Sequence, residues 1–131
     1  MKKEQLTEAE LQVMKCIWNA ECELGLSEIV KRVNDKFKRN WKPQTASTFL
    51  ARLVQKGFLI LKRDSRYYTY QILISEECYL KKQIEDFLEF WDNYSLAQIF
   101  ALFIESQNLS REQRIEIQKK LEKESKFIKE G

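Results

Sequence analysis

Hydrophobic residues recur every three or four positions in the first part of the chain, which is the spacing of an amphipathic helix. Residues 7–19 form the first such segment, and Thr7-Glu-Ala-Glu10 is a capping box at its start. After a short connection that contains Gly25, Ser27 is the expected N-cap of a second helix, which ends near Phe37. The pattern therefore predicts two amphipathic helices at the start of the chain.

Residues 43–56 predict a third helix with two different faces. Pro43 suits the first turn of a helix, and Gly57 suits the left-handed position that ends one. One face carries the expected core residues Ala46, Phe49, Leu50, Leu53 and Val54. The other face has no charge before Arg52 and carries short polar side chains, namely Gln44, Thr45, Ser47 and Thr48. In a chain that is 33% charged, such a surface favours contact with bases and phosphates over contact with water, and Gln44 is suited to pair with adenine.

A strand-turn-strand pattern follows this helix. Residues 58–63 and 66–73 are rich in aromatic and branched side chains, and Asp64-Ser65 predicts the turn between them. Three helices followed by a hairpin are the order of a winged helix-turn-helix. Three residues at the hairpin tip are expected to hold the backbone or the minor groove of DNA: Arg63, Arg66 and Tyr67. The alternative is an exposed turn without that role.

Basic charge is concentrated on the segment from Lys38 to Arg66. This segment holds eight Lys and Arg residues against one Asp, a net charge of +7, whereas the whole chain carries +3 and the remainder therefore −4. Such a concentration is the electrostatic footprint of a phosphate-binding surface. Lys42 and Arg52 are therefore added to the candidate DNA-binding residues, with Arg52 directed to a phosphate. The alternative is a winged-helix protein-interaction module without specific DNA binding, whose basic face is only solvated.

The C-terminal part, residues 75–131, predicts three further helices that are rich in apolar residues. The segment 94–104 is apolar on nearly all sides and must be buried, yet roughly 55 residues cannot bury it alone. A homodimer is therefore expected, held by Phe87, Trp91, Ile99, Phe100, Phe103, Ile104 and Leu121. The predicted fold class is mostly α with a small β-hairpin (α+β), divided into a winged-helix DNA-binding domain (1–74) and a helical dimerisation region (75–131).

Composition excludes several classes of function. The chain has no histidine, which removes Ser-His-Asp and Cys-His catalysis and histidine-bound zinc. Its three cysteines lack CxxC spacing and no glycine-rich loop is present, so we expect no enzyme, no metal site and no cofactor. No apolar run approaches the ~18–20 residues of a membrane helix, and the first residues are polar. A cytoplasmic protein without membrane insertion is expected.

Three motifs carry a resemblance to a known family: Thr7-Glu-Ala-Glu-Leu-Gln-Val-Met-Lys-Cys-Ile-Trp18, Trp41-Lys-Pro-Gln-Thr45 and Arg52-Leu-Val-Gln-Lys-Gly-Phe58. Together they resemble the penicillinase repressor family (the BlaI/MecI/CopY group), and the similarity covers nearly the whole chain. It implies a dimeric repressor with an N-terminal winged helix, a C-terminal dimerisation region and inverted-repeat operators ahead of resistance-type genes. It also places the family's DNA contacts on Gln44, Thr45, Ser47 and Thr48.

The resemblance also bears on induction. The copper-responsive branch carries a C-terminal Cys-x-Cys cluster, whereas this chain has no cysteine after Cys78, so release by copper is not expected. In the β-lactam-responsive branch, a membrane-sensor protease pathway cleaves an Asn-Phe bond, and the matching position here is Leu102-Phe103. Gln44 and Ser47 stand where basic residues are frequent in the family, which implies altered operator contacts.

Overall fold

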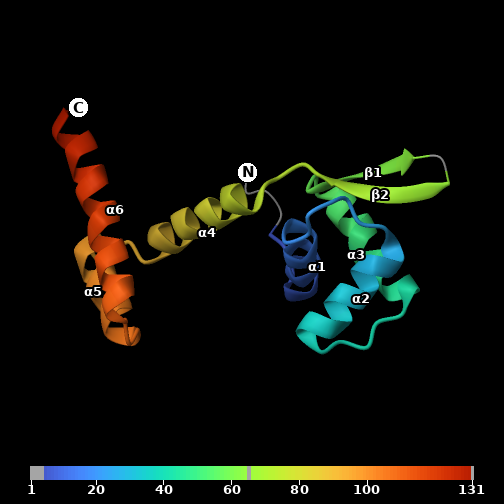
Figure 1. Cartoon of the computed structure of the whole chain (residues 1–131), viewed down its shortest axis with the longest axis horizontal. Helices are drawn as coiled ribbons and strands as arrows, with labels where there is room; N and C mark the ends of the chain where they lie inside the picture. The colour runs from blue at the N-terminus through green and yellow to red at the C-terminus, as the bar shows by residue number, and fades with distance from the viewer. Residues whose placement is uncertain (1–4, 65, 131) are drawn as a thin grey trace. The chain divides into compact units, whose positions relative to one another are not determined.

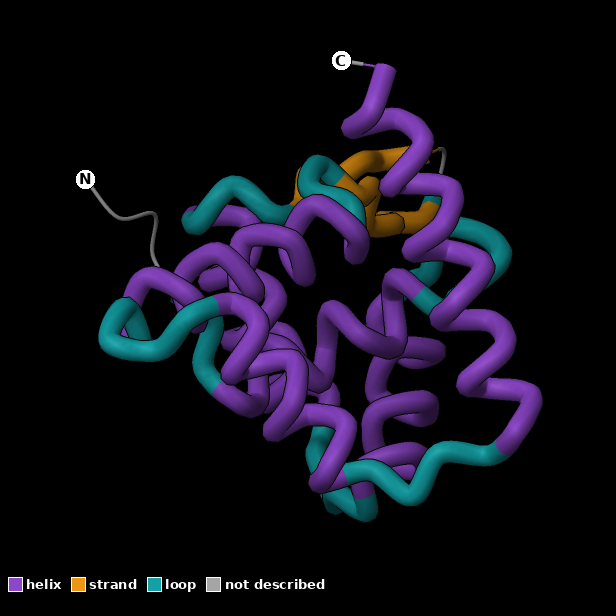
Figure 2. Tube along the Cα trace, turned by 90° about the vertical axis from the view of Figure 1, so that its left-hand side faces the viewer, coloured by secondary structure: helices purple, strands orange, loops and turns teal. Residues whose placement is uncertain are grey.

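The predicted helices and hairpin are present in the structure, a computed structural model that describes residues 5–64 and 66–130. Helices make up most of this part of the chain, and its strands form one hairpin (Figure 1; Figure 2). The chain divides into two compact units, Met1–Ile84 and Glu85–Gly131. No helix in the described residues is long and apolar enough to cross a bilayer.

The first helix, α1 (Glu8–Trp18), begins with the predicted capping box. The Glu10 N–H donates to the Thr7 hydroxyl oxygen at 3.2 Å, and the Thr7 N–H donates to the Glu10 carboxylate at 2.8 Å. Two of the backbone donors at the start of the helix are thereby satisfied.

The second helix, α2 (Leu26–Phe37), begins earlier than predicted, because Gly25 and not Ser27 is its N-cap. The preceding residue explains the difference. Leu24 forms an isolated antiparallel bridge with Tyr70, which fixes the backbone of the connection just before α2. The Tyr70 N–H donates to the Leu24 carbonyl at 3.2 Å, so the chain must turn into α2 directly afterwards. A side chain at Gly25 would lie 3.3 Å from the Tyr68 carbonyl oxygen, which favours glycine at this close approach.

The third helix, α3 (Pro43–Gln55), begins and ends as the sequence predicts. Pro43 occupies the first helical position, and Gly57 has a left-handed φ of +84° just after the C-cap Lys56. The Phe58 N–H donates to the Leu53 carbonyl at 2.9 Å, which closes the end of the helix. The chain then enters the hairpin.

The hairpin pairs β1 (Leu59–Asp64) with β2 (Tyr67–Ile72) in antiparallel register, from Leu59 opposite Ile72 to Asp64 opposite Tyr67. Asp64 therefore belongs to a strand, so its assignment to the turn was wrong. Ser65, the other predicted turn residue, lies outside the described residues.

The core of the first unit is built from all three helices and β1. Its buried apolar side chains come from one face of each element and from the connections beside them: Val13, Met14, Cys16, Ile17, Leu24, Ile29, Val33, Ala46, Leu50, Leu53, Phe58 and Leu59. On α3 the predicted core face is confirmed for Ala46, Leu50 and Leu53, whereas Phe49 is half-buried and Val54 is exposed. Burial of one face leaves the opposite face of α3 turned to solvent.

Three helices follow the hairpin. They are α4 (Glu76–Phe90), α5 (Leu96–Ser106) and α6 (Arg111–Glu130). Ser110 and Gln113 form the capping box predicted for the last helix, with bonds of 2.8 and 3.1 Å. Ser95 and Gln98 form another before α5, which the sequence analysis did not identify.

Candidate nucleic-acid interface

The exposed face of α3 carries every helix residue that the sequence analysis assigned to DNA binding. Ala46, Leu50 and Leu53 anchor the helix in the core. The assigned residues all have exposed side chains: Gln44, Thr45, Ser47, Thr48 and Arg52. Because the buried side chains anchor the helix on one side, this polar face is held in place and lies open to solvent. That these side chains contact DNA stays a prediction.

The start of α3 adds a positive end to this face. Lys42 is exposed and is the N-cap, and the first turn contains no acidic residue. The Thr45 N–H donates to the Lys42 carbonyl at 3.0 Å, so the backbone here is ordered. A helix N-terminus without a nearby carboxylate favours an approaching phosphate.

Thr48 is oriented by its own helix. Its hydroxyl donates to the Gln44 carbonyl at 3.1 Å, one turn earlier. The hydroxyl proton is therefore engaged, while the oxygen can still accept a hydrogen bond and the methyl group can still contact an apolar atom. Thr48 is consequently more suited to accept from a base or touch a methyl group than to donate.

The loop between α2 and α3 is fixed by Asn34. The Trp41 N–H donates to Asn34 Oδ1 at 2.9 Å, and Asn34 Nδ2 donates to the Trp41 carbonyl at 3.1 Å. The Trp41 ring stacks on Phe49 of α3, with ring centres 4.9 Å apart. Trp41 thus acts as a packing anchor that ties the loop to α3. Asn34 holds the Trp41 backbone in place, and the helical pattern alone could not have predicted this role of Asn34.

The tip of the hairpin carries the predicted wing residues in exposed positions. Tyr67 is 72% exposed, and Arg63 and Arg66 are also exposed. The Arg63 guanidinium carbon lies 5.7 Å from the ring centre of Tyr68, its partner across the hairpin. The wing therefore presents two arginines and a tyrosine to solvent, and a role in binding DNA remains a prediction for them.

Glu23 joins the wing to the body of the unit. Its carboxylate accepts from the Thr69 hydroxyl at 3.1 Å and lies 3.8 Å from the Lys62 ammonium. This contact could not be predicted from the sequence pattern, because Glu23 lies in a connection far from the hairpin in sequence. Lys62 is thereby partly neutralised, which leaves the arginines near the tip as the stronger basic groups of the wing.

The second unit exposes the apolar residues that were assigned to dimerisation. Among its described side chains none is buried. Five of the seven assigned residues are at least 42% exposed, namely Phe87, Trp91, Phe100, Phe103 and Leu121, and Ile99 and Ile104 are half-buried. An apolar hollow of about 290 Å³ between α5 and α6 is lined by Phe100, Ile104, Leu109, Ile117 and Leu121 among others. Among the described residues of the second unit, this apolar surface lies exposed.

Leu102 and Phe103, the predicted cleavage position, lie within α5. Both side chains are more than half exposed. Their peptide bond is inside a continuous helix from Leu96 to Ser106. A protease that requires an extended substrate would first have to unwind this helix.

Comparisons with known proteins place the chain among bacterial repressors. The family model described as "Penicillinase repressor" matches residues 6–123. The penicillinase repressor of Bacillus licheniformis is 33% identical over 126 residues, which covers 96% of each chain. The methicillin resistance regulatory protein MecI of Mammaliicoccus sciuri is 26% identical over 119 residues, 91% of this chain and 94% of that protein.

A solved structure is similar to this chain in fold. The solution structure of the DNA-binding domain of the repressor BlaI shares 35% sequence identity and has a TM-score of 0.50. The match covers 60% of this chain and 92% of the BlaI domain. The predicted α+β winged-helix fold is confirmed, and the chain belongs to the penicillinase repressor family.

Proposed function

We propose that this protein is a transcriptional repressor that binds double-stranded DNA sequence-specifically, as a homodimer, at an inverted-repeat operator controlling resistance-type genes. The observation that carries the proposal is the exposed, uncharged face of α3, flanked by Lys42 and Arg52 and anchored by a buried opposite face. Membership of the penicillinase repressor family supports it. Residues 1–74 bind DNA in this proposal, and residues 75–131 form the dimer.

In this proposal the two kinds of residue have separate tasks. Gln44 and Thr48 read base edges in the major groove, where an amide can pair with adenine through two bonds. Lys42, Arg52 and the wing arginines hold phosphates, which fixes the position of α3 but reads no sequence. Sequence specificity therefore depends on the uncharged face, and affinity at low salt depends on the basic groups.

Residues 75–131 supply the dimer in this proposal. Burying one large apolar side chain contributes roughly 1.5–3 kcal/mol, so the exposed aromatic and aliphatic residues of α4, α5 and α6 can together hold two chains. A twofold axis presents two copies of α3 to half-sites one or more helical turns of DNA apart. An inverted repeat is the sequence that matches this symmetry.

Induction in this proposal proceeds through a membrane-sensor protease pathway that cuts the chain at Leu102-Phe103. The position lies in α5, among the residues assigned to the dimer surface, so a cut there separates them. Because the bond is helical, cleavage depends on transient unwinding of α5. Loss of the dimer then releases the operator.

The proposal is tested by measuring DNA binding of the purified chain. Duplexes would be enriched by the protein from a random-sequence library at low salt, and affinities for enriched and random duplexes compared by fluorescence anisotropy. We expect inverted repeats to be enriched and the logarithm of the affinity to fall linearly with the logarithm of salt. Absence of any enriched sequence would overturn the proposal in favour of a protein-interaction module.

A further inference from the structure

The loop before α3 holds an arginine outside the proposed DNA-binding set. Arg39 is half-buried, and its Nε donates to the Gln12 side-chain oxygen of α1 at 2.9 Å. Its guanidinium carbon lies 5.5 Å from the centre of the Trp41 ring. The side chain is thus held by a hydrogen bond at one point and by an aromatic ring at another.

The same aromatic ring connects Arg39 to α3. Trp41 stacks on Phe49, with an interplanar angle of 23°, and the guanidinium carbon of Arg52 lies 5.5 Å from the Phe49 ring centre. Asn34 fixes the backbone of Trp41 through two hydrogen bonds. Two arginines therefore contact one stacked pair of rings, one from the loop and one from the last turn of the helix.

Neither arginine has an acidic partner within the described residues. Glu76, Glu10 and Glu23 pair with Lys15, Lys56 and Lys62, and none of these ion pairs includes an arginine. Within the described residues, Arg39 makes one side-chain hydrogen bond, and Nε is its donor. The two terminal guanidinium nitrogens of Arg39 make no hydrogen bond there. An ordered guanidinium without a carboxylate keeps two parallel donors for an anion, and phosphate matches their spacing.

We infer that Arg39 binds a phosphate of the DNA backbone beside the half-site that α3 reads, with the Trp41–Phe49 pair as a scaffold that it shares with Arg52. This inference rests on the proposed function, because it names a further contact of the same DNA-binding surface. Since Arg39 is already ordered in the free protein, binding loses little side-chain freedom. A lysine at this position would lack the Nε bond to Gln12 and the planar pair of donors.

The test is the salt dependence of DNA binding by the full chain carrying Arg39→Gln. Each dimer carries Arg39 twice, so losing both phosphate contacts should reduce the slope of log affinity against log salt by about 1.8, and should weaken enriched and random duplexes by the same factor. When the salt is raised fourfold, the affinity of the unchanged protein should therefore fall by a factor about 12 times larger than the affinity of the variant. A purely structural role would lower the melting temperature and leave this slope unchanged.

Two further variants make the result decisive. Lys81→Gln removes the same charge from an exposed residue of α4 and should leave the slope nearly unchanged. Gln12→Ala keeps the Arg39 charge but frees the side chain, so the slope should persist while affinity falls about two- to tenfold. If Arg39→Gln does not fold, Gln12→Ala decides the question, and unchanged affinity in that variant overturns the inference.

The two possible failures are distinguishable. If the unchanged protein binds no duplex, the proposed function fails and the inference fails with it. If it binds with a normal salt slope that Arg39→Gln leaves intact, or that Lys81→Gln alters as much, only the inference fails.

Discussion

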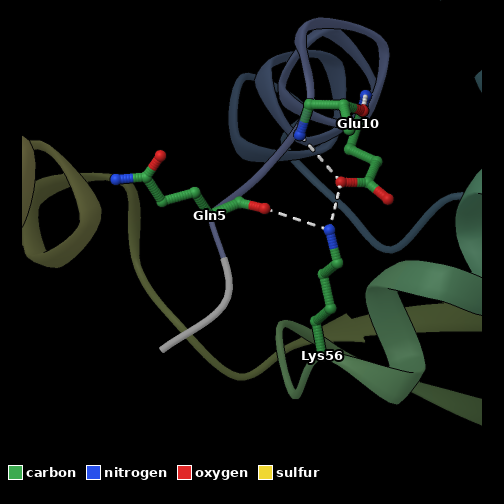
Figure 3. Close-up of polar contacts among 4 residues, drawn as sticks. Gln5, Glu10 and Lys56 are labelled. Carbon is green, nitrogen blue, oxygen red and sulfur yellow. Dashed lines mark hydrogen bonds and ion pairs between the residues drawn. The ribbon is translucent and has the colours of Figure 1, made fainter. Parts of the chain in front are cut away.

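Lys56, the residue that follows α3, forms an ion pair with Glu10 in the first turn of α1 (Figure 3). The ammonium nitrogen lies 2.7 Å from Glu10 Oε1 and also donates to the Gln5 carbonyl at 3.0 Å. The same carboxylate oxygen accepts from the Thr7 N–H at 2.8 Å. Glu10 is only 1% exposed, so a buried carboxylate links the start of α1 to the end of α3, the helix proposed to read DNA.

Removing Glu10 should destabilise the winged helix strongly. We expect Glu10→Ala to lower the free energy of unfolding by about 3–5 kcal/mol, because it leaves the largely buried Lys56 ammonium without its anion. The double variant with Lys56→Ala should lose less than the sum of the two single losses, since the pair is then removed as a whole. Urea denaturation at neutral pH measures all three, and additive losses would show that the two residues do not interact.

The pH dependence of stability should carry the signature of the same carboxylate. Burial raises the pKa of Glu10, but the bonds from Lys56 and Thr7 outweigh it, so the pKa is lowered from its ordinary 4.5. The stabilisation is therefore fully present above about pH 4.5 and is lost as the pH falls through the lower folded-state pKa. Unfolding of the unchanged protein and of Glu10→Gln should be compared from neutral to acidic pH. We expect the difference to be constant above this region and to shrink below it.

Local signals predicted the helices whose ends are specified within one turn. The Thr7 capping box begins α1, and Pro43 and Gly57 delimit α3, because each acts on backbone groups only a few residues away. Ser95 and Gln98 carry the same kind of signal before α5 and could have been recognised from the sequence.

Features that depend on distant residues were not predictable in this way. Gly25 replaces Ser27 as the cap of α2 because Leu24 pairs with Tyr70 of the hairpin. At the candidate site, the exposed face of α3 could be predicted from the sequence of that helix alone. Burial of every third or fourth residue on one side of a helix leaves the opposite face exposed. The surroundings of Arg39 could not be predicted, because Gln12 is 27 residues earlier in the chain.

Base-reading and phosphate-holding residues should separate in a binding assay. Gln44→Ala should weaken the enriched operator by about 1–3 kcal/mol and random DNA very little, because a lost base contact affects only the correct sequence. Arg66→Ala should weaken both duplexes about equally and reduce the salt slope. Anisotropy titrations at two salt concentrations measure both effects. Equal losses on both duplexes for Gln44→Ala would remove it from the base-reading set.

A charge in the apolar surface of α5 should abolish the dimer. Phe103 is 52% exposed in the single chain, and we expect Phe103→Asp to place an unpaired carboxylate in the interface and shift the protein to monomers. Glu105→Gln, on the same helix, is the control and should leave the dimer intact. Light scattering at tens of micromolar gives the mass of each. A monomeric unchanged protein at that concentration would contradict the proposed dimer.

Operator affinity should depend on the C-terminal helices even though they read no base. Two recognition helices joined in one dimer bind with an effective concentration near millimolar for the second contact, which multiplies affinity by roughly 10²–10⁴. A chain truncated after Phe90, at the end of α4, retains the first compact unit, whose core lies entirely before that point. We expect it to keep its helical circular dichroism and to bind a single half-site no more tightly than the non-specific range of roughly 10⁻⁴–10⁻⁶ M.

The full chain and the truncated chain would be titrated on the same inverted repeat and on the same single half-site. A large loss on the inverted repeat with no difference on the half-site is the expected result, because only the inverted repeat can engage both subunits. Equal affinities on the inverted repeat would mean that operator binding does not depend on joining two chains, and cleavage within α5 could then not release the operator.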